Sequence, residues 1–451
     1  MARLPAFVGH HRGPPAAAPV APPAPLRAPA AAAAQSGRGS AGRAATALAA
    51  PVLLGPLWRR SRPSKGRRRR RACCWAQARA VCTEAPAPVS GAVVEQDDPD
   101  FVTFGTMRIS RLGLGTISWS AEDKASEERL QDLALGATAA GSLLDTAERY
   151  GSEFGPPFDR WPFGTPGRCE EILGQALHGR RGAVATKFTP TPWRMSAADV
   201  VKACRASARR LGVEAIDLYQ IHHPDIVQPL KKFGIVNARD NELWEGLADC
   251  LEMGLVRNVG VCNYGPTLLG RAQDALQRRG FRLATNQINF SLLYRRQGVM
   301  PTIKACHESG VGVLAYWPLA MGLLTGASTI AAPGGRAKRL QQYLEGGGGI
   351  PPGGVQPLLE VMREVAEAHG RTCSQVALRW IIEKGAVPIP GARTLERYEE
   401  YHGALGWQLT AAEVERLEAA AEALPFDFEG AGFRFSNAKF VGYGAERWYL
   451  D

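Results

Sequence analysis

The first 83 residues contain no aspartate and no glutamate, although the whole chain of 451 residues has 43 acidic residues. This segment carries 15 of the 54 lysines and arginines, including the run Arg67 to Arg71, and it is rich in Ala and Pro. An acid-free N-terminus with Arg and Ser is typical of an organelle transit peptide, and the weight of Ala and Pro favours a plastid over a mitochondrion. The alternative is a disordered basic arm that stays attached and binds polyanions.

The excess of positive charge is confined to this leader. The formal net charge of the chain is +11, but the residues after Thr83 carry about −4, because all the acidic residues lie there. The basic composition therefore gives no indication of nucleic-acid binding. We expect no nucleic-acid partner.

Long apolar runs are absent after the leader, so we expect no transmembrane segment. Within the leader, the apolar stretch Ala44 to Trp58 contains Pro51 and Pro56 and is too short to span a bilayer, although it could be part of a second sorting signal. A plastid address is compatible with two locations, the stroma and the plastoglobule. In the second location the protein would associate peripherally with plastid lipid bodies.

The cysteines show no C-x-x-C spacing. Three of the nine lie in or at the end of the leader, and the other six are far apart: Cys169, Cys204, Cys250, Cys262, Cys306 and Cys373. This pattern indicates neither a zinc knuckle nor a disulfide framework. We expect reduced thiols.

What the chain does contain, after a linker at 84–100, is an alternation of short apolar runs with longer stretches of helical period. The candidate strands are Arg111–Ile117, Leu143–Ala147, Ala183–Phe188, Ile216–His223, Val256–Asn263, Ala284–Ser291, Val311–Leu319 and Ala386–Ala392. Eight strands, each followed by a helix, predict an α/β fold of the (β/α)8 or TIM-barrel type over residues 101–424, with a C-terminal tail at 425–451. The runner-up is a doubly wound sheet, although the third glycine of G-x-G-x-x-G is missing after Gly113 and Gly115.

Two local features refine this prediction. Ser196 opens a helix with one apolar face, and Thr410 with Glu413 has the spacing of a capping box for the last helix. The Gly-rich connection from Gly326 to about Val355 is either a flexible lid or a surface insertion without a role.

Polar side chains fall at or just after the ends of successive strands. Asp145, Lys187 and His222 lie near three such ends, and Tyr150 follows the first of them by a few residues. In a barrel that rim is where chemistry takes place. Tyr150 could donate a proton to an oxyanion forming on a carbonyl, with Lys187 beside it lowering its pKa and Asp145 keeping Lys187 charged.

The neighbouring histidines must be separated. Strand alternation sends His222 and His223 to opposite faces, so that only one shares the mouth, where it could hydrogen-bond and polarise a substrate oxygen. A metal site at "HHPD" lacks a third ligand at a sensible spacing, so we expect none. Taken singly, each of the four residues could be structural.

The chain resembles the aldo-keto reductase superfamily from about Phe101 to Leu424. The motifs that carry the resemblance stand in the family's order: "LGLGT", "LLDTAERYG", "ATKF", "DLYQIHHPD", "VGVCNY", "NQINFSLL", "AYWPLAMGLLTG" and "PIPGARTLERYEEY". The chain is most similar to plant and algal plastid-targeted members, and more distantly to potassium-channel β subunits and pyridoxal reductases.

The resemblance implies a TIM barrel that binds NADPH and transfers hydride to a small aldehyde or ketone. It places the family's catalytic tetrad on Asp145, Tyr150, Lys187 and His222, with Tyr150 as general acid. The implied cofactor positions are Thr116, Ile117, Asp145, Cys262, Asn263, Gln287, Tyr316, Trp317, Leu319, Gly322, Arg393, Arg397 and Glu400. Two arginines facing the 2′-phosphate favour NADPH over NADH.

Three positions depart from the family pattern. Cys262 and Trp317 each replace a usual serine, and Tyr401 replaces a usual asparagine. The aromatic stretch Phe154 to Gly167 is a candidate apolar substrate wall, to which Trp193 could add; packing of these loops onto the barrel is the alternative. A second hypothesis for the whole chain is an NADPH-binding redox-sensing module similar to channel β subunits. The oligomeric state is not predicted.

Overall fold

A computed structural model describes residues 98–119, 124–151, 168–191, 193–225, 239–295, 298–326 and 354–424, all within the unit Val89–Asp451. The predicted leader, most of the linker, the aromatic stretch, the body of the Gly-rich loop and the C-terminal tail lie outside the described residues. The boundaries assigned to those segments stay predictions.

Eight parallel strands form one sheet in which each strand pairs with the next along the chain. They are β3 (Leu114–Gly115), β4 (Leu144–Asp145), β5 (Val184–Phe188), β6 (Ile216–Ile221), β7 (Val256–Cys262), β8 (Leu283–Asn289), β9 (Gly312–Tyr316) and β10 (Ala386–Pro388). The first and last strands also meet: Gly115 bridges Gly391, and the amide of Gly113 donates to Pro388 O at 2.9 Å. The sheet is therefore a closed barrel. The predicted (β/α)8 fold is confirmed, and the doubly wound alternative is wrong.

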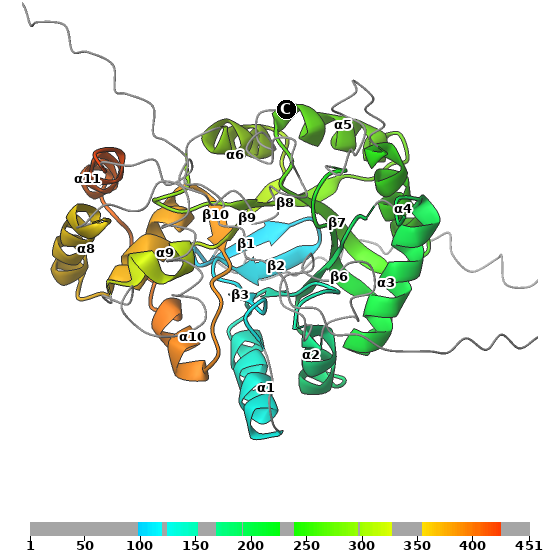
Figure 1. Ribbon diagram of the computed structural model, residues 1–451, viewed down its shortest axis with the longest axis horizontal. Coiled ribbons are helices and arrows are strands. Elements are labelled where there is room, and N and C mark those ends of the chain that lie inside the picture. The colour runs from blue at the N-terminus through cyan, green and yellow to red at the C-terminus, as the bar shows by residue number, and fades with distance from the viewer. Residues whose placement is uncertain are drawn as a thin grey trace, which may run out of the picture. The chain divides into compact units, whose positions relative to one another are not determined.

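Helices surround the strands of the barrel, as Figure 1 shows. They are α1 (Lys124–Ala139), α2 (Cys169–Leu177), α3 (Ala197–Leu211), α4 (Asp240–Glu252), α5 (Pro266–Gln277), α6 (Val299–Glu308), α8 (Gln356–His369), α9 (Cys373–Glu383), α10 (Leu395–His402) and α11 (Ala411–Glu422). A short 3-10 helix, η2 (Ala320–Thr325), follows β9. The predicted capping box of Thr410 with Glu413 is confirmed, and Ser196 caps α3 as expected.

A β-hairpin that the sequence analysis did not predict fills the centre of the view in Figure 1. Its strands, β1 (Phe101–Phe104) and β2 (Met107–Ser110), pair antiparallel. Phe104, Met107 and Ile109 form an apolar cluster with Leu143, which directly precedes β4, and with one residue from each of five strands: Ala185, Leu218, Ala284, Leu314 and Val387. The hairpin therefore seals the end of the barrel at which these strands begin.

This apolar layer fixes where the polar site lies. Side chains alternate along a strand, so the residue two positions further points the same way. Two residues beyond Leu143, Ala185 and Leu314 come Asp145, Lys187 and Tyr316, respectively. The barrel interior therefore changes from an apolar layer at the sealed end to a polar layer at the carboxyl end of the strands.

Candidate active site

Asp145 and Lys187 form a buried ion pair inside the barrel. Lys187 is fully buried, and its Nζ lies 2.7 Å from Asp145 Oδ2. The ammonium also donates to Thr146 O at 2.8 Å, while Gln287 Nε2 donates to Asp145 Oδ1 at 2.7 Å. Burying two charges is tolerated only when hydrogen bonds satisfy both, and each charge here has more than one partner.

Tyr150 and His222 lie next to this pair on its mouth side. The third contact of Lys187 Nζ is Tyr150 OH at 3.4 Å, and Tyr150 OH lies 3.4 Å from His222 Nε2. The two rings meet edge to face, with centroids 5.7 Å apart. The structure thus brings together all four residues predicted as the tetrad, in the order Asp145, Lys187, Tyr150, His222.

The electrostatics of the phenol differ from expectation. Burial raises the pKa of Tyr150 well above its usual value, with smaller contributions from Asp145, Cys262 and Cys169. The net shift is therefore upward, contrary to the prediction that Lys187 would lower this pKa. The Lys187 charge is offset by Asp145 at 2.7 Å, so the loss of solvent around the phenol dominates.

Both histidines are held neutral. Burial, followed by the charges of Lys187 and His223, lowers the pKa of His222 well below its usual value, and burial also lowers the pKa of His223. Only the His222 ring lies against Tyr150, whereas His223 Nδ1 lies 2.8 Å from Pro224 O. The prediction that only one of the two joins the group at the mouth is confirmed.

The lowered pKa of each histidine predicts a loss of stability in mild acid. The unfolded chain protonates a histidine near pH 6.5, whereas the folded barrel resists protonation of His222. The stabilisation is fully present above about pH 6.5 and is lost as the pH falls below it, by up to about 1.4 kcal/mol per pH unit for each histidine. We expect urea unfolding at about pH 7.5 and pH 5.5 to show this fall, and His222→Asn to make it shallower. An unchanged pH dependence in that variant would contradict the assignment.

Four predicted cofactor residues gather at the ends of β7, β8 and β9. The amide of Asn263 donates to Gln287 O at 2.9 Å, and the Asn263 side chain donates to His222 O at 3.3 Å. Tyr316 OH donates to Asn263 Oδ1 at 2.9 Å, and Cys262 is buried beside them. Asn263 has a φ of 63°, a left-handed conformation that is uncommon for a residue other than glycine. Such strained backbone tends to cluster at ligand sites.

The loop after β9 has the same character. Trp317, Ala320 and Met321 have φ values of 53°, 46° and 55°, so all four non-glycine residues with positive φ among the described residues lie at the ends of β7 and β9. Leu319 and Gly322, both predicted to contact the cofactor, belong to this turn. Their shared location supports a ligand-binding role for this part of the rim.

The remaining predicted residues lie further along the rim, beyond β9, where β10 meets β3. Thr116 is buried after β3, and Ile117 is 50% exposed. Arg393 Nε donates to Ser118 O at 3.0 Å, which ties the end of β10 to the loop after β3. On α10, Arg397 NH1 donates to Glu400 Oε2 at 2.8 Å, so these two residues form an ion pair with each other.

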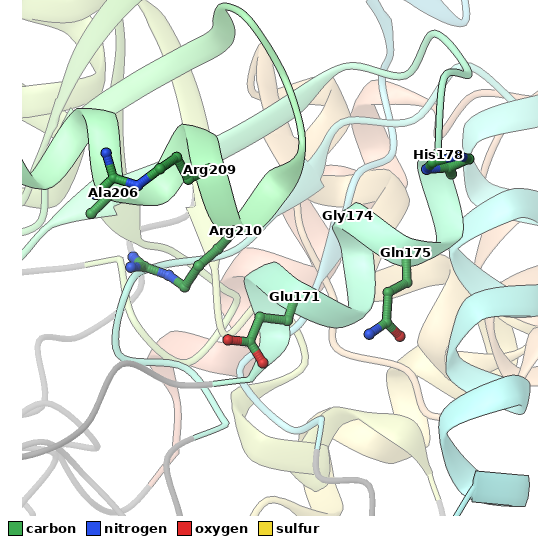
Figure 2. A pocket seen from close by; sticks show the side chains of 7 residues that line it. All are labelled: Glu171, Gly174, Gln175, His178, Ala206, Arg209 and Arg210. Atoms are coloured by element: carbon green, nitrogen blue, oxygen red, sulfur yellow. The ribbon is translucent and has the colours of Figure 1, made fainter.

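A hollow of about 460 Å³ lies elsewhere, on the outer surface between α2 and α3 (Figure 2). It is lined by Glu171, Gly174, Gln175, His178, Ala206, Arg209 and Arg210. None of the predicted site residues belongs to it. Within the described ranges, His, Cys, Asp and Glu form no group of three or more that could hold a metal ion, and no helix is long and apolar enough to cross a membrane.

Three residues that connect the segments carrying the tetrad were not predicted from the sequence: Glu148, Thr189 and Arg194. Glu148 lies between Asp145 and Tyr150, and its carboxylate accepts two hydrogen bonds from Arg194, at 2.9 and 3.0 Å, and one from the Thr189 amide, at 2.8 Å. The only available signal was the charge of Glu148 inside "LLDTAERYG". A glutamate in a turn is usually solvated, so its burial could not be inferred from the sequence.

A (β/α)8 barrel whose polar side chains gather at the carboxyl ends of the strands has the architecture of the barrel enzymes. A family model described as aldo/keto reductase matches residues 111–422, so the chain belongs to the aldo/keto reductase family.

Individual relatives agree with this. The chloroplastic pyridoxal reductase of Arabidopsis thaliana is 35% identical over 341 residues, which cover 72% of this chain and 86% of that protein. A thermostable aldo-keto reductase in complex with the inhibitor epalrestat matches with a TM-score of 0.52 at 25% identity, covering 71% of this chain and 99% of that one. An aldo-keto reductase of Bombyx mori in complex with NADP has a TM-score of 0.53 at 24% identity, covering 72% and 94%. The last of these supports the fold alone.

Proposed function

We propose that this protein is an NADPH-dependent reductase that converts an aldehyde or ketone to an alcohol, with Tyr150 as the general acid. One observation carries the proposal: the Tyr150 hydroxyl lies between the buried Lys187 ammonium and the neutral His222 ring, at 3.4 Å from each. A hydroxyl with two hydrogen-bonding neighbours at the carboxyl rim of a barrel is placed to meet the oxygen of a carbonyl substrate.

The chemistry follows from the state of each group. The bound nicotinamide supplies the hydride. Because burial raises its pKa, Tyr150 stays protonated at neutral pH and yields its proton only to a strongly basic atom, such as the alkoxide oxygen developing on the substrate. Lys187 stabilises the phenolate that remains, and Asp145 keeps Lys187 charged. His222, being neutral, can hydrogen-bond the same oxygen.

The donors and acceptors at the rim fit a nicotinamide dinucleotide. We propose that Asn263 and Gln287 bind the carboxamide and that Tyr316 stacks on the nicotinamide ring. Arg393 and Arg397 would bind the 2′-phosphate that distinguishes NADPH from NADH, since guanidinium groups match phosphate geometry. Thr116, Ile117, Cys262 and the loop from Trp317 to Gly322 would complete the contacts, with Glu400 at the adenine.

Arg397→Ala is expected to reduce the preference for NADPH over NADH. Loss of a charge-assisted hydrogen bond costs about 1.5–3 kcal/mol, which corresponds to about a tenfold to hundredfold rise in KM for NADPH. The KM for NADH should barely change. Arg416→Ala is a matched control, because Arg416 pairs with Glu364 on the outer helices α11 and α8. An equal rise in KM for both cofactors would contradict a 2′-phosphate contact.

The substrate and the location are further parts of the proposal. The similarity to a chloroplastic pyridoxal reductase supports a plastid address and makes pyridoxal the first carbonyl to test. A fluorescent fusion of residues 1–83 tests the address, and a cytosolic signal would refute it. The relatives reported above are reductases, which favours an enzyme over a redox-sensing binding module.

The direct test is cofactor binding followed by turnover. Purified protein should shift the fluorescence of NADPH on binding and should oxidise NADPH when given pyridoxal, short reactive aldehydes or quinones. Binding with no oxidation across the panel would refute the enzyme and leave the binding module. Failure of both would refute the proposal.

A further inference from the structure

Thr189 is the only described side chain that hydrogen-bonds the second nitrogen of the His222 ring. Its Oγ1 lies 3.3 Å from His222 Nδ1, on the side of the ring opposite Tyr150, whose hydroxyl lies 3.4 Å from Nε2. Thr189 follows β5 directly, two residues after Lys187, and it is 2% exposed. The two ring nitrogens therefore have different hydrogen-bonding neighbours. Nδ1 contacts the buried Thr189, and Nε2 contacts Tyr150 at the mouth of the barrel.

The backbone of Thr189 is held firmly. Glu148 Oε1 accepts the Thr189 amide at 2.8 Å, and both oxygens of the same carboxylate accept hydrogen bonds from Arg194 at 2.9 and 3.0 Å. The Glu148 amide in turn donates to Lys187 O at 3.4 Å. One buried carboxylate thus connects the turn that carries Tyr150 to the segment that carries Lys187 and Thr189.

The donors and acceptors around Thr189 determine which atom donates in the hydrogen bond between Thr189 Oγ1 and His222 Nδ1. A neutral imidazole has one N–H donor and one acceptor nitrogen, and burial keeps His222 neutral. Within the described part of the chain, His222 Nδ1 is the sole hydrogen-bonding partner of Thr189 Oγ1. If Nδ1 carried the proton, the buried hydroxyl proton of Thr189 would have no acceptor, which is costly.

The opposite arrangement leaves no such group buried. When the Thr189 hydroxyl donates to Nδ1, the proton of His222 resides on Nε2 and points toward the Tyr150 oxygen. Tyr150 then accepts from Lys187 and His222, and its own proton is directed to the mouth, where Tyr150 is partly exposed. That is the direction required of a general acid.

We propose that Thr189 is a positioning residue, whose hydroxyl fixes His222 as the Nε2–H tautomer and thereby turns the Tyr150 proton toward the substrate. The effect on turnover rests on the proposed function, whereas the effect on the tautomer does not. Thr189 itself does not touch the reacting atoms.

The experiment compares Thr189→Val, which removes the hydroxyl at nearly constant shape, with Thr189→Ser, which keeps it. The tautomer is read from the ¹⁵N chemical shifts of the His222 ring in full-length, ¹⁵N-histidine-labelled protein. The parent and Thr189→Ser should show a protonated Nε2. Thr189→Val should show a mixture of the two tautomers, because no hydroxyl then holds Nδ1 as the acceptor nitrogen.

Activity gives the second readout. Thr189→Val should lower kcat about tenfold to hundredfold with little change in the KM for NADPH, and Thr189→Ser should restore kcat. Thr191→Val is the matched control, since the buried Thr191 hydroxyl has no hydrogen-bond partner in the described residues; neither readout should change.

Two outcomes would overturn the inference. One is a Thr189→Val protein whose His222 keeps the parent tautomer, and the other is a failure of Thr189→Ser to restore it. A tautomer that shifts as expected in a protein without any turnover would refute the proposed function and leave this inference standing.

Discussion

Tyr150→Phe is expected to abolish most turnover while leaving the binding of NADPH essentially intact. The substitution removes only the hydroxyl that lies 3.4 Å from both Lys187 Nζ and His222 Nε2. Loss of a positioned general acid typically lowers kcat by about 10²- to 10⁴-fold. Steady-state kinetics with the best carbonyl of the panel, combined with a fluorescence titration of NADPH, would measure both quantities.

Tyr219→Phe is the matched control for this variant. Tyr219 lies on β6 and is fully buried, and its hydroxyl has no hydrogen-bond partner among the residues that the structure describes. The same chemical change there should leave kcat close to that of the parent. Normal turnover by Tyr150→Phe would show that another group protonates the substrate, and the proposed mechanism would have to be abandoned.

Lys187→Met is expected to have the largest effect on stability. It leaves the Asp145 carboxylate buried without the ammonium at 2.7 Å, and breaking a buried ion pair in this way costs about 3–5 kcal/mol. Methionine fills a similar volume, so an empty cavity contributes little. Urea unfolding should show a lower midpoint with an unchanged slope, and activity should be lost as well.

The double variant Lys187→Met with Asp145→Asn separates charge from packing. Asparagine removes the uncompensated charge and keeps an oxygen that can accept the hydrogen bond from Gln287 Nε2, which is 2.7 Å long in the parent. Most of the lost stability should return while activity stays absent. If the double variant is as unstable as Lys187→Met, the loss comes from packing and the electrostatic explanation is wrong.

Much of the barrel and of the site could be predicted because strand periodicity is local. A buried strand that ends in a polar residue is readable from a few neighbours, as in the segments around Asp145 and Lys187, and parallel strands bring such ends to one rim. The grouping of the tetrad followed from this geometry. The roles of its members rested on the chemistry of each residue type and on the family resemblance.

The remainder depends on contacts between distant residues. The hairpin of β1 and β2 was not predicted, because its value lies in filling the barrel end, where Thr106 and Asn258, 152 positions apart, hydrogen-bond each other. The pKa of Tyr150 was expected to fall beside Lys187, but the extent of burial that raises it is a property of the whole fold. The burial of Glu148 could not be predicted either, because it depends on contacts with Thr189 and Arg194, which lie 41 and 46 positions away in the sequence.

Closure of the barrel between its first and last strands also determines when the site can form. Arg393 and Ser118 are joined across 275 positions of the chain, and Trp119 reaches Ala392 across 273. Contacts between such distant positions form slowly, because a long loop must be closed before they can form. A nascent chain that has completed β4 and β5 already carries Asp145, Tyr150 and Lys187. It still lacks Arg393 and Arg397, which follow β10. We therefore expect the capacity to bind NADPH to appear abruptly and late in folding, and a chain truncated before β10 to lack it altogether.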